Sequence, residues 1–394
     1  MKNRLIILSI LTIATIACKK PISLAPVAKV TSYLVVDGNI SSGDSTTITL
    51  SRTVALDSNS RTNPEPGATV VVESASGTSY KLTGRPNGTY ISAPLNLGAN
   101  EKYCLKITTA NGSRYASDFV PVKNSPAIDS IHTYITANGL QIGLDTHDAG
   151  GTSRYYRWEY TETFQIQSAF LSVIIVKQKL DFPRRPPDFQ YERAAPADMI
   201  YNCWRSDTSG TIITGTTAKL GVDKVSNAPI ALVASDSEKF KFRYSILVKQ
   251  YAITTDAFNY FELLKKNTEQ IGGIFDPQPS ELTGNLHCIT NLNEPVIGFI
   301  TAGQVTQKRI FINKTDLPAS WVAVTPYDGC VLNTLLYARP LALHPDQSVN
   351  EVDNLIYSGL QLTVDYAPGG YASSTPVCVD CTLRGTNIKP SFWK

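Results

Sequence analysis

The stretch YCLKITTANG, residues 103–112, decides the fold class of this chain, because it joins an alternating strand pattern to a tight turn. Tyr103, Leu105 and Ile107 recur at every second position, which places them on one face of a β-strand. Asn111-Gly112 is a strong short signal for a hairpin turn. The stretch therefore predicts an antiparallel β-hairpin.

The same pattern extends on both sides of this hairpin. Alternating runs lie at 33–36, 47–50 and 69–72, and Asn87-Gly88 supplies a second hairpin signal. About seven strands in roughly ninety residues are typical of an immunoglobulin-like β-sandwich. We therefore predict such a sandwich over residues 30–124, acting as a spacer or docking module.

A boundary is predicted at 123–126, because Pro126 follows small polar residues. Strand patterns with more aromatic residues resume beyond it, as in 154–160. Thr255-Asp256, followed by regularly spaced apolar residues and a glycine pair, predicts an α-helix near 255–270. The predicted fold is mainly β: the N-terminal sandwich, then a larger β-rich domain over 125–394 with one α-helix.

The N-terminus has the pattern of an exported lipoprotein. Lys2 and Arg4 precede an apolar run of a dozen residues, which is shorter than the roughly 20 residues of a membrane-spanning helix. Residues 1–17 are therefore predicted to be a signal peptide. Ala17 directly before Cys18 resembles the lipobox of bacterial lipoproteins, so we expect Cys18 to carry acyl chains such as palmitate. Residues 18–29 would be the lipidated cysteine and a spacer.

Charge and composition narrow the expected partners. The formal net charge of +3 falls to +1 when Lys2 and Arg4 are subtracted with the leader, which leaves no electrostatic footprint for nucleic acid. Lys19 after the acylated cysteine favours the outer membrane, reached through the lipid anchor. The face of the membrane on which the protein lies stays open.

Six further cysteines are expected to form disulfides, because an exported chain enters an oxidising compartment. Cys104 lies on the opposite strand face from its apolar neighbours and is the odd member. Fifteen pairings of six cysteines exist, and the sequence does not choose among them. We expect Cys378 and Cys381 to hold the C-terminal tail to an upstream cysteine. The disulfide candidates are Cys203, Cys288, Cys330, Cys378 and Cys381.

The extreme C-terminus carries two large aromatic residues, Phe392 and Trp393. Chain ends usually fray, and a disordered end seldom carries this much apolar area. We therefore expect both rings to dock on the body of the protein, next to the cysteine clamp.

The sequence does not favour redox, metal-binding or catalytic roles for these residues. Cys378-x-x-Cys381 resembles a redox motif but is followed by no helical pattern, and a zinc site with His287 and Cys288 lacks the usual spacing. The acidic loop 145–151 has too few alternating oxygen ligands for calcium. Asp145, Glu159 and Glu162 were considered as paired catalytic carboxylates. We expect no enzyme activity, no catalytic residues, no metal site and no cofactor.

Several segments carry a resemblance to a known family. These are RYSILVKQY at 243–251, NTEQIGGIFDPQP at 267–279, CVDCT at 378–382 and GTN at 385–387. Together they resemble a Bacteroidota outer-membrane lipoprotein family catalogued as a domain of unknown function, the 4249 family. The likeness covers nearly the whole mature chain and implies a lipoprotein that is often encoded beside a TonB-dependent receptor.

The function expected from these observations is binding without catalysis. We expect a non-enzymatic outer-membrane lipoprotein that acts in TonB-dependent transport, as an accessory binding or lid subunit beside a TonB-dependent receptor. The alternative is a structural or assembly lipoprotein of an outer-membrane complex, with no ligand of its own.

Overall fold

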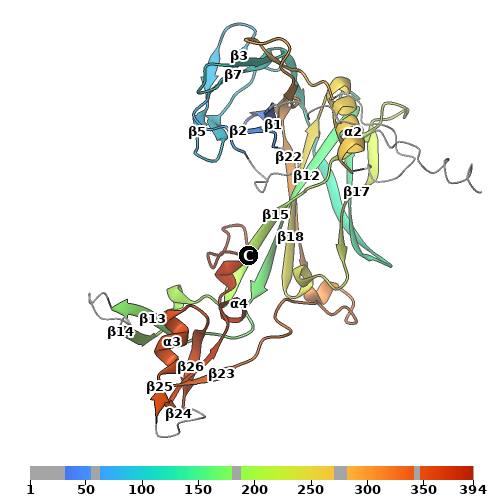
Figure 1. The fold of residues 1–394 in the computed structure, drawn as a ribbon. Helices are drawn as coiled ribbons and strands as arrows, with labels where there is room; N and C mark the ends of the chain where they lie inside the picture. Colours follow the sequence, from blue (N-terminus) through green and yellow to red (C-terminus); the bar gives the residue numbers. More distant parts are fainter. Residues whose placement is uncertain (1–31, 55–62, 180–187, 270–281, 341–346, 394) are drawn as a thin grey trace, which may run out of the picture.

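The computed structural model describes residues 32–54, 63–179, 188–269, 282–340 and 347–393. In this part the chain is mainly β, as the sequence predicts, and its strands build two β-sandwiches and a smaller distal module (Figure 1). The predicted signal peptide, Cys18 and the spacer lie outside the described residues.

The first nine strands form most of the N-terminal sandwich. They are β1 (Leu34–Ser42), β2 (Ser45–Arg52), β3 (Thr69–Ser74), β4 (Ser79–Lys81), β5 (Thr83–Gly84), β6 (Thr89–Pro94), β7 (Lys102–Thr108), β8 (Arg114–Ser117) and β9 (Val120–Asn124). Alternation buries one face of each main strand: Val70 and Val72 of β3 lie in the same core as Leu105 and Ile107 of β7.

Three strands from much later in the chain complete this sandwich. They are β19 (Leu286–Cys288), β20 (Val296–Ile297) and β21 (Thr301–Gln304). Strand β21 lies between β1 and β9 and is parallel to both. Gly303 permits this close approach, since a Cβ there would lie 1.8 Å from the carbonyl oxygen of Lys123. The unit predicted over 30–124 thus contains residues that the sequence placed in the second domain.

A second pair of sheets forms the central sandwich. One sheet contains β10 (Ile128–Thr136), β11 (Gly139–His147) and β17 (Lys224–Ala234). The other contains β12 (Tyr155–Gln167), β15 (Asn202–Thr208), β16 (Ile213–Thr216), β18 (Arg243–Ala252) and β22 (Thr306–Asn313). Ile142 and Leu144 of the first sheet share one buried cluster with Trp158, Tyr244 and Ile246 of the second. Burial of these large side chains is the main source of stability for this unit.

A buried amide links the central sandwich to the segment that enters it. Gln250 on β18 accepts a hydrogen bond from the indole N–H of Trp158, at 2.9 Å. Its own amide nitrogen donates to the carbonyl oxygen of Pro126 at 2.9 Å and to the hydroxyl of Thr146 at 3.0 Å. Gln250 is fully buried. The predicted boundary at 123–126 therefore contacts the central sandwich through hydrogen bonds.

The predicted helix is present as α2 (Thr255–Glu269). The hydroxyl of Thr254 accepts a hydrogen bond from the Ala257 amide, which satisfies one free N–H of the first turn. Ala257, Tyr260 and Phe261 are buried at the spacing of one helix face. The helix contacts β12 and β16.

The distal module has its own small core, which the prediction of one C-terminal domain did not anticipate. Its strands are β13 (Ile174–Lys179), β14 (Asp188–Arg193), β23 (Asn333–Leu336), β24 (Arg339–Pro340), β25 (Ser348–Val349), β26 (Leu362–Ala367) and β27 (Gly370–Ser374), and its helices are α3 (Glu351–Tyr357) and α4 (Pro376–Val379). Ile174, Leu335, Val352 and Tyr371 form the core. Helices α3 and α4 add to the single helix that the sequence predicted.

The described residues also form four short 3-10 helices. They are η1 (Pro196–Asp198), η2 (Glu238–Phe240), η3 (Lys314–Asp316) and η4 (Cys381–Leu383). Only Asp380 separates α4 from η4, so Cys378 lies in α4 and Cys381 in η4. The prediction that no helix follows the Cys-x-x-Cys motif was therefore wrong, although both helices are short.

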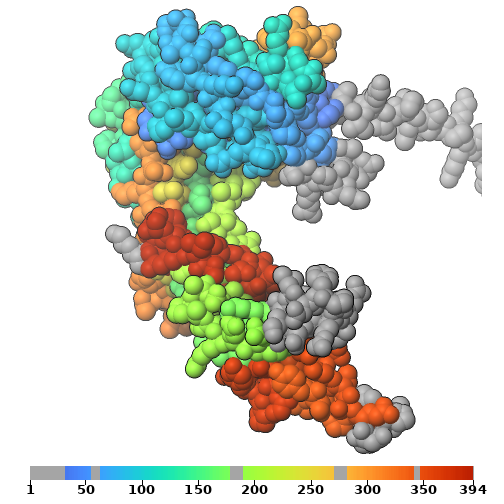
Figure 2. Space-filling model, turned by 90° about the vertical axis from the view of Figure 1, so that its left-hand side faces the viewer, coloured from blue at the N-terminus to red at the C-terminus, as the bar shows by residue number. Residues whose placement is uncertain are grey.

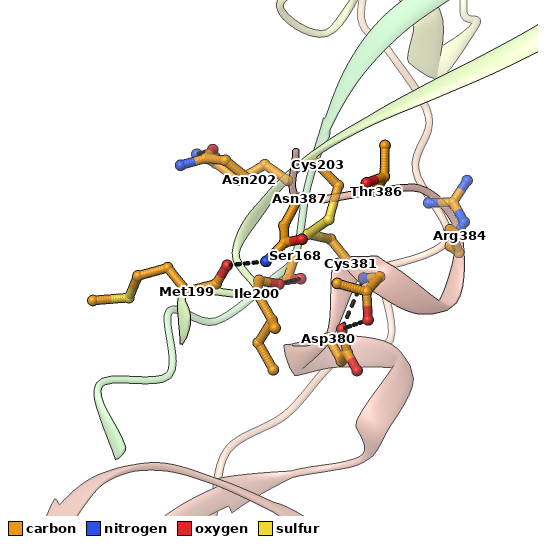
Figure 3. Close-up of a disulfide and its surroundings, with 12 residues drawn as sticks. Ser168, Met199, Ile200, Asn202, Cys203, Asp380, Cys381, Arg384, Thr386 and Asn387 are labelled. Atoms are coloured by element: carbon orange, nitrogen blue, oxygen red, sulfur yellow. Dashed lines mark hydrogen bonds between the residues drawn. A yellow bond between two sulfur atoms is a disulfide. The ribbon is translucent and has the colours of Figure 1, made fainter. Parts of the chain in front are cut away.

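Two disulfides hold the C-terminal tail. Cys203 on β15 is bonded to Cys381 in η4 (Figure 3), and Cys330 is bonded to Cys378 in α4. Beside the first bond, Trp204 and Thr386 exchange two backbone hydrogen bonds of 2.8 and 2.9 Å. These contacts place the tail against the central sandwich.

The tail aromatics are docked, as expected from their size. Trp393 is buried and meets Phe311 of β22 edge to face, with ring centroids 5.7 Å apart. The guanidinium of Arg309 lies 3.6 Å from the ring centre of Phe392. Aromatic burial and the two disulfides therefore act on the same segment.

Replacing Cys203 and Cys381 together with alanine should lower the free energy of unfolding by roughly 2–5 kcal/mol, because the bond restricts the unfolded chain. Denaturant unfolding and limited proteolysis of the tail measure the effect. The control Cys104→Ala removes a buried free thiol and should leave the tail resistant. Equal protease resistance in both variants would contradict the role of the bond.

Candidate functional site

The strongest candidate site is a polar crevice between the N-terminal sandwich and the outer face of the central sheet. It consists of two adjoining cavities of about 420 and 240 Å³. Both cavities are lined by Asp37, Arg157, Glu159 and Lys249. We call these four residues and the space between them the inter-sandwich crevice.

Strand alternation aims the crevice residues outward. Tyr156 and Trp158 of β12 are buried in the central core, so Arg157 and Glu159 point to the opposite face. On β18, Lys249 pairs with Glu159 and Tyr251 pairs with Arg157 in the antiparallel register. The same two strands therefore build the core on one face and the crevice on the other.

Arg157 is held in a fixed arrangement. Its guanidinium forms an ion pair with Glu159 and lies 4.4 Å from the ring centre of Phe261 on α2 and 5.4 Å from that of Tyr251. The Tyr251 hydroxyl donates to the other oxygen of Glu159 at 2.7 Å. Burial, reinforced by the charge of Glu159, raises the pKa of Tyr251. We refer to these four residues as the Arg157 frame.

Lys249 and Asp37 differ from the frame, because neither has an ion-pair partner in the described part of the chain. Among the residues that the structure describes, neither side chain makes an ion pair within 4.0 Å or a hydrogen bond. Lys249 belongs to the central sheet and Asp37 to β1 of the N-terminal sandwich. Two opposite charges from two walls thus face one space.

The wall from the N-terminal sandwich is polar. At the second cavity, β1 and β2 present side chains with hydroxyl, amide or carboxylate groups, which include Asn39, Ser41, Thr47 and Thr49. Gln307 of β22 lies across from them and pairs with Lys249 in the register. The opposite end of the crevice is apolar, where Ile212, Phe261 and Leu264 line the larger cavity.

The three carboxylates considered as catalytic pairs do not come together. Glu162 is buried and accepts hydrogen bonds from Lys239 and Tyr244 on the core side of β12. Glu159 lies on the other face, within the Arg157 frame. Asp145 accepts bonds of 2.7 Å from the Asn227 amide and the Ser130 hydroxyl, and these bonds lower its pKa. Each of the three carboxylates is therefore held by its own partners, and none of them contacts another.

The acidic loop 145–151 is a turn organised by Asp148. Its carboxylate accepts hydrogen bonds from Ser153, Thr152 and the Gly150 amide, all between 2.9 and 3.0 Å. Burial alone would raise the pKa of Asp148, but these hydrogen bonds outweigh it and lower the pKa to about 2. The carboxylate oxygens are used within the loop itself.

The disulfides decide between the alternatives for the cysteines. Cys378 and Cys381 are bonded to two different upstream cysteines, so they form neither a redox pair with each other nor a zinc site with His287 and Cys288. Cys288 was a disulfide candidate, but it is a buried free thiol in the N-terminal core, on β19. Cys104 is also free and buried. Burial raises the pKa of the Cys104 thiol.

The described part of the chain contains neither a metal-ligand cluster nor a membrane-spanning helix. No three His, Cys, Asp or Glu side chains in this part of the chain gather as a group that would hold a metal ion. None of its helices has the length and apolar character needed to cross a bilayer.

Sequence reasoning missed the inter-sandwich crevice. Lys249 and Tyr251 belong to the segment 243–251 that carries the family resemblance, but nothing in that segment shows which residues oppose it. Asp37 gives no signal at all, since it is a lone carboxylate in an alternating strand. The crevice exists because two distant strands face each other.

Comparisons with known proteins give one informative match. A family model described as a domain of unknown function (DUF4249) matches residues 19–309. No curated protein matches the chain significantly. A solved structure described as "Complete structure of manganese lipoxygenase of Gaeumannomyces graminis and partial structure of zonadhesin of Komagataella pastoris" aligns with 11% identity, 57% of this chain, 90% of that chain and a TM-score of 0.13. A TM-score this low supports no inference about fold or function.

Asp148→Asn should remove a pH-dependent part of the stability. The folded pKa of about 2 lies below the unfolded value of about 3.9, so the ionised carboxylate stabilises the fold above about pH 4, and this contribution is lost as the pH falls toward 2. The difference in unfolding free energy between wild type and variant should shrink over that range. Urea unfolding at several pH values measures it, with Asp365→Asn as the control. A constant difference would contradict the prediction.

Proposed function

This chain belongs to the DUF4249 family, and we propose that it is a non-enzymatic outer-membrane lipoprotein that binds a ligand beside a TonB-dependent receptor. The observation that carries the proposal is the inter-sandwich crevice. It presents a preorganised Arg157 frame together with two charges that have no ion-pair partner among the described residues. Concave sites of this size with a few convergent polar groups are typical of ligand binding.

The shape of the molecule supports a lid or accessory role. Figure 2 shows a curved molecule in which the N-terminal sandwich and the distal module lie at the two ends, with a hollow between them. A curved surface of this kind suits a subunit that covers part of a larger partner. This hollow is distinct from the inter-sandwich crevice.

Carboxylates and thiols of the kind that catalysis uses are here held in structural contacts, which supports binding without catalysis. Glu162 and Asp145 are each held by structural hydrogen bonds, and Cys378 and Cys381 are in disulfides. Catalytic carboxylates and thiols instead need access to a substrate and a poised protonation state. In the crevice, the Glu159 carboxylate is likewise held by Arg157 and Tyr251.

The anchor in this proposal is Cys18. Ser32, where the described part begins, lies fourteen positions further along the chain, and an extended chain of that length reaches at most about 50 Å. Several acyl chains on one cysteine would give firm attachment. The N-terminal sandwich would then lie nearest the membrane.

The alternative is a structural or assembly lipoprotein, and one feature of the distal module favours it. Large apolar side chains there are solvent-exposed, among them Leu332, Tyr337, Tyr357, Leu360 and Tyr366. Tyr337 and Tyr366 both contact the ring of Tyr371, with ring centroids 5.9 and 5.5 Å apart, and a contiguous exposed apolar patch often marks a protein interface. In this alternative the interface alone would account for the function.

Affinity capture from detergent-solubilised outer membrane tests the proposal. Capture of a single TonB-dependent receptor with the tagged full chain is the expected result. Recovery of a barrel-assembly or secretion machine, without a receptor, would favour the structural alternative. The double variant Tyr337→Ser with Tyr366→Ser is a useful comparison, because it reduces the exposed apolar area of the distal module without touching the crevice.

Cys18→Ser should release the protein from the membrane, because the proposed anchor is that single side chain. Cell fractionation, together with labelling by a radioactive fatty acid, measures the change. Cys104→Ser serves as the control for loss of a thiol elsewhere. A Cys18→Ser protein that stays in the membrane fraction, with an unlabelled wild type, would show that the lipoprotein assignment is wrong.

A further inference from the structure

We propose that the inter-sandwich crevice binds short peptides with free amino and carboxyl ends, an inference that rests on the binding role proposed above. The argument begins with charge. The four residues shared by both cavities are two acids, Asp37 and Glu159, and two bases, Arg157 and Lys249. Their formal charges cancel, and Asp44 adds one further carboxylate at the smaller cavity, so the crevice favours a ligand that carries both signs.

Of the four shared residues, one of each sign is available to such a ligand. Arg157 and Glu159 neutralise each other, and Tyr251 satisfies the second carboxylate oxygen of Glu159. Lys249 and Asp37 have no ion pair or side-chain hydrogen bond among the described residues. A ligand carboxylate would therefore be drawn to Lys249 and a ligand ammonium to Asp37.

These two charges come from two different walls of the crevice. Lys249 extends from the central sheet and Asp37 from β1, so they approach the crevice from opposite walls. Sugar hydroxyls hydrogen-bond to both groups but bring no opposite charge to either of them. A zwitterion pairs both. The charge arrangement thus favours a peptide over a saccharide.

The size and lining of the cavities agree with a chain of two or three residues. The larger cavity, at about 420 Å³, lies in the range of small-ligand sites, and the smaller one of about 240 Å³ adjoins it. Ile212, Phe261 and Leu264 provide an apolar surface for a side chain in the larger cavity. Gln307 in the smaller one offers a donor and an acceptor for peptide groups, whereas the Asn39 amide is already engaged by Ser41 and Thr301.

Equilibrium dialysis of the detergent-purified full chain against a random tripeptide library, with retained peptides identified by mass spectrometry, tests the inference. Parallel libraries carry an acetylated amino end or an amidated carboxyl end, and maltotriose is the neutral saccharide. The free-ended library should be retained most strongly. Each cap should weaken retention by about tenfold or more, the usual effect of losing a charged hydrogen bond.

Two variants assign the ends. Lys249→Gln should weaken binding of free-ended peptides about tenfold while leaving amidated peptides nearly unchanged, and Asp37→Asn should act in the same way on the amino end. Lys266→Gln on the exposed side of α2 is the matched control and should have no effect. Circular dichroism checks that these substitutions leave the fold intact.

These experiments test the identity of the ligand separately from the proposed function of the protein. Retention of maltotriose, equal retention of free-ended and capped peptides, or no retention of any peptide overturns the peptide assignment. Because capture of a receptor and fatty-acid labelling of Cys18 do not depend on the crevice, they can still succeed in that case. Failure of both of those experiments instead overturns the proposed function.

Discussion

The hydrogen bonds of the buried Gln250 amide are the interaction on which the rest of the structure depends. One side chain connects Trp158 on β12, Thr146 on β11 and the carbonyl of Pro126 in the segment between the two sandwiches. Every polar atom of this amide is engaged, which a fully buried position requires. The bonds therefore hold the two sheets of the central sandwich and the entry of the chain in one arrangement.

That arrangement determines what faces outward. With Trp158 held inward, the neighbouring Arg157 and Glu159 must point to the other face of β12, because side chains alternate along a strand. Tyr251 and Lys249 do the same on β18. The floor of the inter-sandwich crevice is thus a consequence of core packing. Its opposite wall comes from β1, which β21 joins to β9 by parallel pairing.

The far end of the molecule is stabilised in a different way. The distal module has a small core of only a few large side chains, and the disulfide-bonded tail that ends at the docked Trp393 connects it to the central sandwich. A small core supplies limited stability, so covalent links are a common addition in exported proteins. The molecule can in this way present a distal surface without a large core beneath it.

Local features of this protein were determined by its sequence. Hydrophobic periodicity predicts the strand pattern around 103–112 and the helix near 255–270, and side-chain size predicts the burial of Trp393. Both can be read from residues that are neighbours in the sequence. Only the tertiary structure decided the pairing of Cys203 with Cys381, the free thiol of Cys288, the return of β21 into the first sheet, and the placement of Asp37 and Lys249 at one crevice. Each of these joins residues far apart in the chain, and contact between distant strands is set by the packing of whole sheets, for which no short stretch of sequence carries a signal.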